Sequence, residues 1–531
     1  MLRSLLTFAF ASLASLSLSF TFAQTDGPPN ILLIISDDLG VDHTRGYHSG
    51  GLMPTTPTLD SLRAAGITFE NAWSAPVCSP TRGAIITGKH GIKTGILGVP
   101  GELTTEEVSL FEALDIETDN DYAKALVGKW HLSPMGNGNA SAPLEHGVDF
   151  FDGVTGGGVG NYFMWNRSQG GMNSTETTYA TTAFTDAARD WINQQEEQPW
   201  LMWLAHVAPH SPFHLPPDGL YSLNPVNNDQ DNYVTMIEAL DTEIGRLINS
   251  IPEEELDNTL IIYVGDNGTP NQRLKDYPNN HGKGSLYQGG IRVPLIISGA
   301  GVSRQGEREA ALVMVADLFA TILEVAGAEL PGGRFNSLSF DHLFDNSEGS
   351  TRDYNYSDRD DGYAIRGPRY KLIERDGNQE FYDLELDSFE TNDLLLAGLN
   401  SAQQIIKDDL EAEAQTIRSG WSCRDYIQNG DETGIDCGGS SCTPCITSVE
   451  AVGPAEVQIF PNPASNQVLI RSSGAAIEEV RILSLTGQEL FRQLGINQQE
   501  TRIELSSLPP QLYLLQLKTN NTVETVRLVK Q

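Results

Sequence analysis

The stretch "ILLIISDD", residues 31–38, joins a continuous apolar run directly to a pair of carboxylates. The run shows no alternation of apolar and polar residues, so it predicts a strand that is buried on both faces of a sheet. Four more runs have the same character, namely AKALVGKW (123–130), LMWLAHV (201–207), LIIYVG (260–265) and VPLIISG (293–299). We interpret all five as fully buried strands of a mostly parallel sheet.

Helical patterns lie between these strands. They cover residues 57–66, 185–195 and 233–248, and Thr185 is the candidate N-cap of the second helix. Strands that alternate with helices indicate an α/β fold built on a mostly parallel sheet.

The sequence changes character after about residue 345. Residues 363–387 predict strands joined by an Asp-Gly turn, and residues 401–418 predict a helix. We expect them to form a small antiparallel subdomain against the main sheet. From residue 455 onward, short alternating strands separated by turn residues predict a terminal β-sandwich.

Residues 1–23 have one Arg near the start, a long run of apolar and small residues, and a small residue before Gln24. This pattern predicts a secretory signal peptide, with a membrane anchor as the alternative, and we expect the mature protein outside the cytoplasm. No other stretch predicts a membrane span.

Four cysteines crowd into residues 423–445 and predict a compact module with two disulfides in any of three pairings. They are Cys423, Cys437, Cys442 and Cys445. The module also carries a set of oxygen side chains that could hold a cation, although turn formation is the alternative that we favour. This set is Asn429, Asp431, Glu432 and Asp436. Cys78 is left over, and it is either buried and inert, paired between chains, or used chemically.

The chain of 531 residues has 70 acidic and 34 basic residues, which gives a formal net charge of −36. No basic face is evident, so nucleic acid is excluded as a partner. A polyanionic substrate would be repelled unless a local cluster of cations reverses the field in one cleft.

Polar residues follow four of the predicted strands. They are Asp37-Asp38, Lys129 with His131, His210, and Asp266-Asn267. In open α/β sheets, ligands bind outside the carboxyl ends of the strands, so we expect these residues at one edge. Period-two alternation predicts that Lys129 and His131 point to the same side. Carboxylate and amide oxygens suit Ca²⁺ or Mg²⁺ and do not suit zinc.

The segment "CSPTRGAIITG", residues 78–88, predicts a helix with Pro80 in its first turn. Cys78 then lies at the helix N-terminus, where backbone N–H groups favour an anion, and Arg82 offers a bidentate fork to an oxyanion. A buried structural cysteine is the alternative.

Residues 28–420 resemble the formylglycine-dependent, or type I, sulfatases of the alkaline-phosphatase-like superfamily. The resemblance rests on the C-x-P-x-R-G core together with PNILLIISDDLG, GKWHL, APHSP, YVTMIEALDTEIGRLI, GDNG, GKGSLYQGGIRVP and YKLI…FYDLELD. Thr81 stands where the signature usually has Ser, and Gln288 stands where Glu is common. The resemblance implies an alkaline-phosphatase-like α/β/α sandwich.

The resemblance also implies the role of each site residue. A maturation enzyme would oxidise Cys78 to formylglycine (3-oxoalanine), whose hydrated aldehyde attacks the sulfur of a sulfate ester. The metal, usually Ca²⁺, with Mg²⁺ as the alternative, would be held by Asp37, Asp38, Asp266, Asn267 and the modified Cys78. Arg82 and Lys129 would hold the nucleophile and the developing charge, and His131 would take a proton in the elimination step. His210 would be the general acid for the leaving alcohol, and Lys283 would clamp a sulfate oxygen, so Lys129, His210 and Lys283 would contact substrate.

The last part of the chain resembles the C-terminal sorting domains of the type IX secretion system of Gram-negative bacteria. The motifs FPNPASN, LTGQEL and LYLLQL…RLVK carry this resemblance. It implies export by that machinery, followed by release or surface attachment. The expected units are a signal peptide (1–23), a catalytic α/β domain (24–345), a C-terminal sulfatase subdomain (346–420), a cysteine-rich linker (421–450) and a sorting domain (455–531).

We therefore expect a secreted sulfatase that acts on sulfated carbohydrate. The alternatives are a formylglycine-dependent phosphodiesterase or phosphonate monoester hydrolase, and a glycan-binding surface protein whose cysteine is never converted. Five side chains on Gly-, Pro- and aromatic-rich loops could hold a sugar, with loop packing as the alternative that we favour. They are Trp165, Tyr162, His214, His43 and Arg45.

Overall fold

The computed structural model describes residues 27–419 and 457–530. Gaps interrupt the first part at 48–49, 119–120, 134–138, 196–197, 227, 329–335 and 348–350, and the second at 461–466, 473–475, 484–488, 507, 509–511 and 520–521. The predicted signal peptide and the cysteine-rich module, with its four cysteines and its candidate cation ligands, lie outside the described residues. Among the helices that the structure describes, none is both long and apolar enough to cross a bilayer.

The main sheet has ten strands in the order β10-β2-β9-β8-β1-β7-β3-β4-β5-β6. Their bounds are β1 (Asn30–Ser36), β2 (Gly66–Trp73), β3 (Ala123–Lys129), β4 (Phe150–Val154), β5 (Trp165–Gln169), β6 (Met172–Glu176), β7 (Trp200–Ala205), β8 (Thr259–Gly265), β9 (Leu295–Gly299) and β10 (Glu307–Met314). The apolar run at residues 31–36 lies in β1. All seven residues of this strand are buried, and the strand pairs in parallel with β7 on one side and β8 on the other.

Four of the five predicted strands are parallel neighbours at the centre of this sheet, namely β3, β7, β1 and β8. The fifth, β9, is a strand as predicted, but it runs antiparallel to both β8 and β2. The prediction of a parallel strand over residues 293–299 was therefore wrong. Burial on both faces produces a continuous apolar run whichever way the strand runs, so the pattern does not encode direction.

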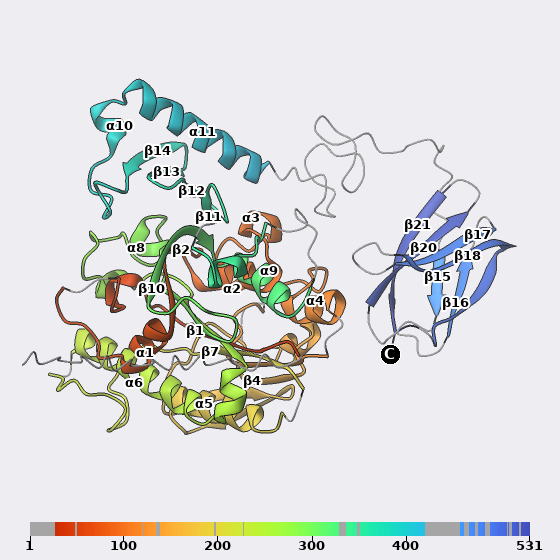
Figure 1. Ribbon diagram of the computed structural model, residues 1–531, viewed down its shortest axis with the longest axis horizontal. Helices are drawn as coiled ribbons and strands as arrows, with labels where there is room; N and C mark the ends of the chain where they lie inside the picture. The colour runs from red at the N-terminus through yellow and green to blue at the C-terminus, as the bar shows by residue number, and fades with distance from the viewer. Residues whose placement is uncertain are drawn as a thin grey trace, which may run out of the picture.

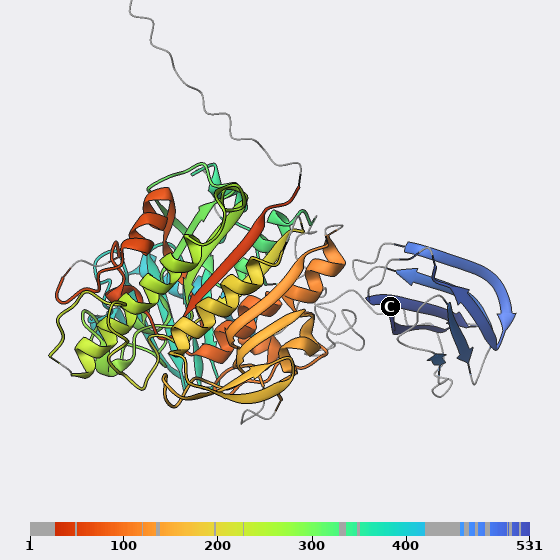
Figure 2. The same ribbon diagram turned by 90° about the horizontal axis from the view of Figure 1, so that it is seen from below.

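Helices cover both faces of the sheet (Figures 1 and 2). Their bounds are α1 (Pro57–Ala65), α2 (Cys78–Thr87), α3 (Gly91–Thr94), α4 (Leu110–Glu117), α5 (Ala180–Ile192), α6 (Asp229–Ile248), α7 (Glu253–Asp257), α8 (Gln288–Ile291) and α9 (Asp317–Val325). Apolar side chains of α1, α5 and α6 share one core with β1, while those of α2, α4 and α9 share the core on its other face. The chain thus forms the predicted α/β/α sandwich.

Thr185 does not cap a helix. Helix α5 begins at Ala180, and Thr185 lies inside it, buried, with its hydroxyl donating to the Thr181 carbonyl. A threonine side chain that bonds the preceding turn of its own helix gives no visible sequence signal, so the cap prediction was wrong.

A second sheet is antiparallel, in the order β11-β12-β13-β14. Its elements and the helices that follow are β11 (Asn355–Arg359), β12 (Gly362–Arg366), β13 (Tyr370–Arg375), β14 (Asn378–Asp383), α10 (Leu394–Ala397) and α11 (Ser401–Arg418). Asp376 and Gly377 both have positive φ, 50° and 80°, as the predicted Asp-Gly hairpin turn requires. Leu410 of α11 packs on Tyr356 and Phe381 of the sheet.

The last described strands form two antiparallel sheets around one core (Figure 1, blue). Their bounds are β15 (Val457–Phe460), β16 (Gln467–Ser472), β17 (Ile477–Leu483), β18 (Glu489–Gln498), β19 (Glu500–Glu504), β20 (Leu512–Thr519) and β21 (Thr522–Val529). This arrangement agrees with the predicted β-sandwich.

Candidate active site

Cys78 is the first residue of α2, as predicted. It follows the extended residue Val77, and Pro80 lies in the first turn of the helix. The thiol is buried, and it donates a hydrogen bond to Asp37 Oδ1 at 3.4 Å. Burial, together with the nearby carboxylates of Asp266 and Asp37, raises the pKa of this thiol far above its usual range. The unmodified cysteine is therefore a protonated thiol and a poor nucleophile.

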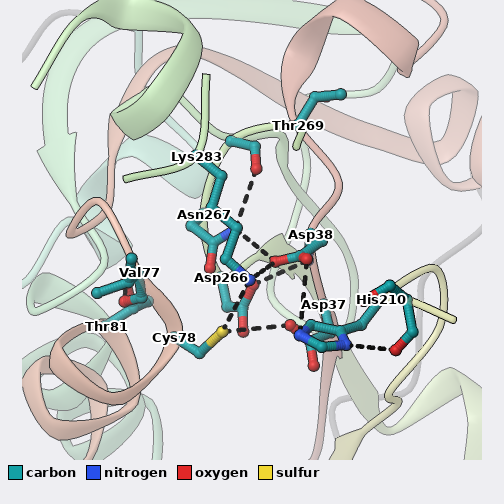
Figure 3. Close-up of polar contacts among 12 residues, drawn as sticks. Asp37, Asp38, Val77, Cys78, Thr81, His210, Asp266, Asn267, Thr269 and Lys283 are labelled. Carbon is teal, nitrogen blue, oxygen red and sulfur yellow. Dashed lines mark hydrogen bonds and ion pairs between the residues drawn. The ribbon is translucent and has the colours of Figure 1, made fainter. Parts of the chain in front are cut away.

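The carboxylates that meet this thiol follow the neighbouring parallel strands β1 and β8. Ser36 pairs with Gly265 at the ends of these strands, so the residues that follow emerge side by side. Ligand atoms of Asp37, Asp38, Asp266 and Cys78 all lie within 4.8 Å of one another, and all four residues are buried (Figure 3). The structure thus brings residues from three separate segments to one point.

Asn267 completes this group of oxygen atoms. Its Nδ2 donates to Asp38 Oδ1 at 2.8 Å, and its Oδ1 is buried without a hydrogen-bond partner among the described residues. A buried amide oxygen without a partner is costly unless something else binds it. Beside three carboxylates, this free oxygen fits a hard divalent cation, so the residues present suit the metal that the sequence predicts.

Each carboxylate of the group also contacts a cation. Lys129 Nζ lies 2.5 Å from Asp37 Oδ2, Arg82 Nη2 lies 2.9 Å from Asp266 Oδ2, and Lys283 Nζ lies 2.5 Å from Asp38 Oδ1. Lys283 Nζ is also 3.7 Å from Cys78 Sγ. These three cations balance the charges of the three carboxylates, so the site is not itself acidic although the chain as a whole is.

The charges shift the pKa values of two carboxyl groups in opposite directions. Burial alone would raise the pKa of Asp37, but the charges of Lys129 and His210 outweigh it, so this pKa is lowered. For Asp266, burial and repulsion from Asp37 raise the pKa, and Arg82 offsets only part of this rise. A bound cation would remove that repulsion between carboxylates.

His131 reaches the site by a different route from the one predicted. Strand β3 ends at Lys129, and His131 has a φ of 58°, so the alternation of a strand does not apply to it. Burial, followed by the positive charges of Lys129 and Arg82, lowers the pKa of His131 well below its ordinary value. Its Nδ1 is buried and has no hydrogen-bond partner among the described residues. His131 is therefore a neutral imidazole at the cationic edge of the site.

His210 lies in the loop after β7, and its Nε2 is 3.8 Å from Asp38 Oδ2. Its Nδ1 lies 2.8 Å from the carbonyl oxygen of Ser211, which can only accept a hydrogen bond. Nδ1 must therefore carry a proton, and Nε2 is the atom that can gain or donate one at the site.

Neighbouring residues hold these side chains in place. The hydroxyl of Thr81 accepts from Ala75 N at 3.0 Å and so braces the turn before Cys78. Tyr233 donates from its hydroxyl to the Asp38 carbonyl at 2.7 Å, and Asp38 itself has a φ of 68°. Gln288 is buried and accepts from Trp73 Nε1 at 2.9 Å, so it supports the fold behind the site.

Sequence reasoning missed two supporting residues, which come from β11 of the second sheet. Ser357 donates to the Ser74 carbonyl at 2.9 Å, and Arg359 donates to the carbonyl of Gly284, next to Lys283. These contacts connect segments about 75 to 285 residues apart in sequence. No local pattern could have revealed them.

The side chains considered for sugar binding are mostly packed within the loops. Tyr162, Trp165 and His43 are buried, which agrees with the favoured alternative. His214 packs against Tyr162 with tilted rings whose centroids are 4.3 Å apart, and Arg45 Nε donates to the Pro54 carbonyl.

Three family models match the chain. The sulfatase model matches residues 29–328, a model described as N-sulphoglucosamine sulphohydrolase, C-terminal, matches residues 280–419, and a model described as secretion system C-terminal sorting domain matches residues 458–531. Arg82, Lys129 and the residues of the acidic group all lie within the first match.

Two sulfatases are among the proteins similar in sequence to this chain, in agreement with these family models. The chain is 27% identical over 327 residues to arylsulfatase J of Mus musculus, covering 57% of this chain and 53% of that protein. It is 28% identical over 354 residues to N-acetylgalactosamine-6-sulfatase of Canis lupus familiaris, covering 58% of this chain and 64% of that protein. Each match spans less than two thirds of the relative's own length.

The fold is also found in solved structures. The crystal structure of Ps i-CgsB in complex with k-i-k-neocarrahexaose matches with a TM-score of 0.63 at 24% identity, covering 75% of this chain and 94% of the other. The sulfatase model matches more than half of the 531 residues, and it includes the segments that meet at Cys78. The chain belongs to the sulfatase family.

Proposed function

We propose that this chain is an exported sulfatase that hydrolyses sulfate esters of carbohydrates. Its nucleophile would be formylglycine made from Cys78 by a maturation enzyme, and its metal would be Ca²⁺, with Mg²⁺ as the alternative. The observation that carries this proposal is the meeting of Cys78 with Asp37, Asp38 and Asp266 within 4.8 Å, in a family whose members hydrolyse sulfate esters.

The thiol that the chain encodes is unsuited to attack, because its pKa is raised by burial and by the carboxylates around it. Formylglycine in its hydrated form supplies a hydroxyl nucleophile and a route for releasing sulfate, and a divalent cation supplies Lewis acidity for that hydroxyl and for the sulfate oxygens. Asp37, Asp38, Asp266, Asn267 and residue 78 are the groups that would hold the cation.

The chain's own cations would then act on the negative charge of the sulfate group. Lys283 Nζ already lies within 3.7 Å of the position of the nucleophile, and Lys129 and Arg82 are held rigidly by their buried ion pairs. Preorganised charges of this kind stabilise charge that develops in the transition state without needing to reorient.

Protons at the site would be handled by two imidazoles. His210 Nε2 faces the site with Nδ1 fixed on a carbonyl, so His210 can protonate the alcohol that leaves. The neutral imidazole of His131 can accept a proton when sulfate is released, because burial and neighbouring cations disfavour its charged form until then.

The carbohydrate substrate is supported by the names of two similar proteins, an N-acetylgalactosamine-6-sulfatase and a protein solved with a neocarrahexaose. Export is supported by the sorting-domain model at residues 458–531, and it involves the type IX secretion machinery as partner, with the protein secreted or at the cell surface. We propose the domain limits 24–345, 346–420 and 455–531, with residues 1–23 as a signal peptide and 421–450 as a disulfide-bonded linker.

The test is release of inorganic sulfate by protein matured in a host that converts Cys78. Chondroitin sulfate, heparin and carrageenan oligosaccharides would be compared with 4-nitrophenyl sulfate and with phenyl phosphonate and phosphodiester substrates. We expect sulfate release that EDTA abolishes and Ca²⁺ restores. Faster hydrolysis of the phosphonate or phosphodiester would contradict a sulfatase, and glycan binding without any turnover would favour a binding protein.

A further inference from the structure

The loop between β4 and β5, residues 155–164, lies directly against both histidines of the site. The carbonyl oxygen of its first residue, Thr155, accepts a hydrogen bond from the backbone N–H of His131 at 3.3 Å. A Cβ added to Gly157 would lie 2.7 Å from His131 Nε2, and one added to Gly158 would lie 3.4 Å from His210 Nδ1. Only glycine leaves room for His131 at the first of these positions, so this backbone forms one wall of the active site.

Tyr162 anchors the far end of this loop to the segment that carries His210. Its hydroxyl lies 2.6 Å from the His210 carbonyl and 2.8 Å from the Val207 carbonyl, and its ring is 1% exposed. The same ring packs against His214, four residues beyond His210, at a centroid distance of 4.3 Å. The loop and the His210 segment are therefore one packed unit.

Phe163 is the next residue, and it is exposed where its aromatic neighbours are not. It is 43% exposed, whereas Tyr162, Trp165 and Tyr179 are each 5% exposed or less. Its ring centroid lies 5.3 Å from Tyr179 and 5.5 Å from His214, which fixes the ring's position. This ring therefore offers an exposed apolar face on the loop that contacts both histidines of the site, beside the segment that carries His210.

Polar groups stand beside this ring. The Oδ1 of Asn161 accepts a hydrogen bond from Phe163 N at 2.8 Å, which fixes the turn, and the Asn161 side chain is otherwise exposed to solvent. Both ring nitrogens of His214 already have partners, because Nδ1 lies 2.9 Å from the Pro212 carbonyl oxygen and Nε2 lies 3.2 Å from the Tyr179 hydroxyl, so this imidazole holds the Phe163 ring in place. An aromatic face beside an exposed amide matches the two surfaces of a pyranose, its apolar C–H face and its ring of hydroxyls.

We propose that Phe163 is the stacking platform of a sugar subsite, with Asn161 as its polar partner. This proposal rests on the proposed function and names where the sugar would bind when its sulfate group lies at residue 78. The platform is uncharged, so it attracts a pyranose without depending on the field of a chain with net charge −36. The subsite thus separates recognition of the sugar from recognition of the sulfate.

The test compares Phe163→Ala with Phe163→Trp and with the unchanged protein. The substrates are the most rapidly desulfated of the chondroitin sulfate, heparin and carrageenan oligosaccharides, and 4-nitrophenyl sulfate, which has no pyranose. We expect Phe163→Ala to raise KM for the oligosaccharide, so that its kcat/KM falls about tenfold further than that of the aryl ester. Phe163→Trp retains most of the oligosaccharide activity. Leu396→Ala is the matched control, because it removes an 87% exposed apolar side chain from α10.

A second measurement does not depend on turnover. Calorimetric titration of the same oligosaccharides into Cys78→Ala protein, with and without Phe163→Ala, should show about tenfold weaker binding for the double variant. Equal losses on oligosaccharide and aryl ester, or unchanged KM and binding, would overturn the platform. Failure of the unchanged protein to release sulfate from any ester would instead contradict the proposed function, and the titration would still decide the subsite.

Discussion

Lys129 and Asp37 form an ion pair from which water is excluded. The Nζ and Oδ2 atoms are 2.5 Å apart, and both side chains are 0% exposed. Removing one partner of such a pair leaves a buried charge without compensation. We expect Lys129→Met to lower the free energy of unfolding by about 3–5 kcal/mol, measured by urea denaturation in EDTA. Sulfate release should fall at least about a hundredfold, because a preorganised charge is lost from the site.

The control for this prediction is Arg189→Met on α5. Arg189 pairs with Asp190 at 2.7 Å, and the two side chains are 33% and 62% exposed. We expect a change of less than about 1 kcal/mol for such a surface pair. A Lys129→Met protein as stable and as active as the parent would show that the pair has no part in the site.

Asn267 offers the most specific test of the metal site. Its buried Oδ1 has no hydrogen-bond partner among the described residues, so Asn267→Ala should remove a ligand oxygen, together with the hydrogen bonds that Nδ2 donates to Asp38 Oδ1 and to the Gly268 carbonyl. We expect the Ca²⁺ concentration that half-maximally raises the melting temperature to increase about tenfold or more. Asn378→Ala, at an exposed position of the β13–β14 hairpin, is the control. The site assignment fails if both variants respond to Ca²⁺ as the parent does.

The assignment of His210 as general acid predicts a dependence on the leaving group. An alkoxide of a sugar is a poor leaving group and needs a proton, whereas 4-nitrophenolate leaves without one. His210→Ala should therefore lower kcat for a sulfated sugar about a hundredfold more than kcat for 4-nitrophenyl sulfate. Equal losses for the two substrates would mean that His210 positions the substrate and does not protonate it.

His206 predicts how stability depends on pH. It is 0% exposed, and neither ring nitrogen has a hydrogen-bond partner in the described part of the chain. Burial, and the charge of Arg246 to a lesser extent, lower its pKa from 6.5 to about 3. At pH values between about 3 and 6.5, His206 is protonated in the unfolded chain and neutral in the folded chain. Stability is therefore lost as the pH falls below 6.5, at about 1.4 kcal/mol per pH unit.

His206→Leu should reduce this loss, measured as the free energy of unfolding between pH 6.5 and 4.5. The exposed histidine His342, replaced by Leu, is the control. An unchanged slope in His206→Leu would mean that other groups cause the acid sensitivity.

The centre of the site could be predicted from the sequence because it follows from one rule of topology. Buried apolar runs end in polar residues, and parallel strands deliver those residues to one edge, so Asp37, Asp38, Asp266 and Asn267 meet as expected. The position of Cys78 followed from local helix chemistry, since Pro80 fits a first turn.

Features that depend on tertiary packing could not be predicted in this way. The direction of β9 and the positive φ of His131 leave no trace in the pattern of apolar residues. The contacts of Ser357 and Arg359 depend on a sheet formed hundreds of residues later. The sequence shows Tyr162, Phe163 and Trp165 as equivalent aromatic residues, and only packing makes Phe163 the exposed one.

The central claim is that residue 78 is the reactive group beside a metal site. Tandem mass spectrometry of the tryptic peptide containing Cys78, from active protein purified from its native host, tests this claim most directly. The account predicts an aldehyde in place of the thiol at this residue, in proportion to the specific activity. A fully active protein whose peptide carries only an intact cysteine at position 78 would contradict it.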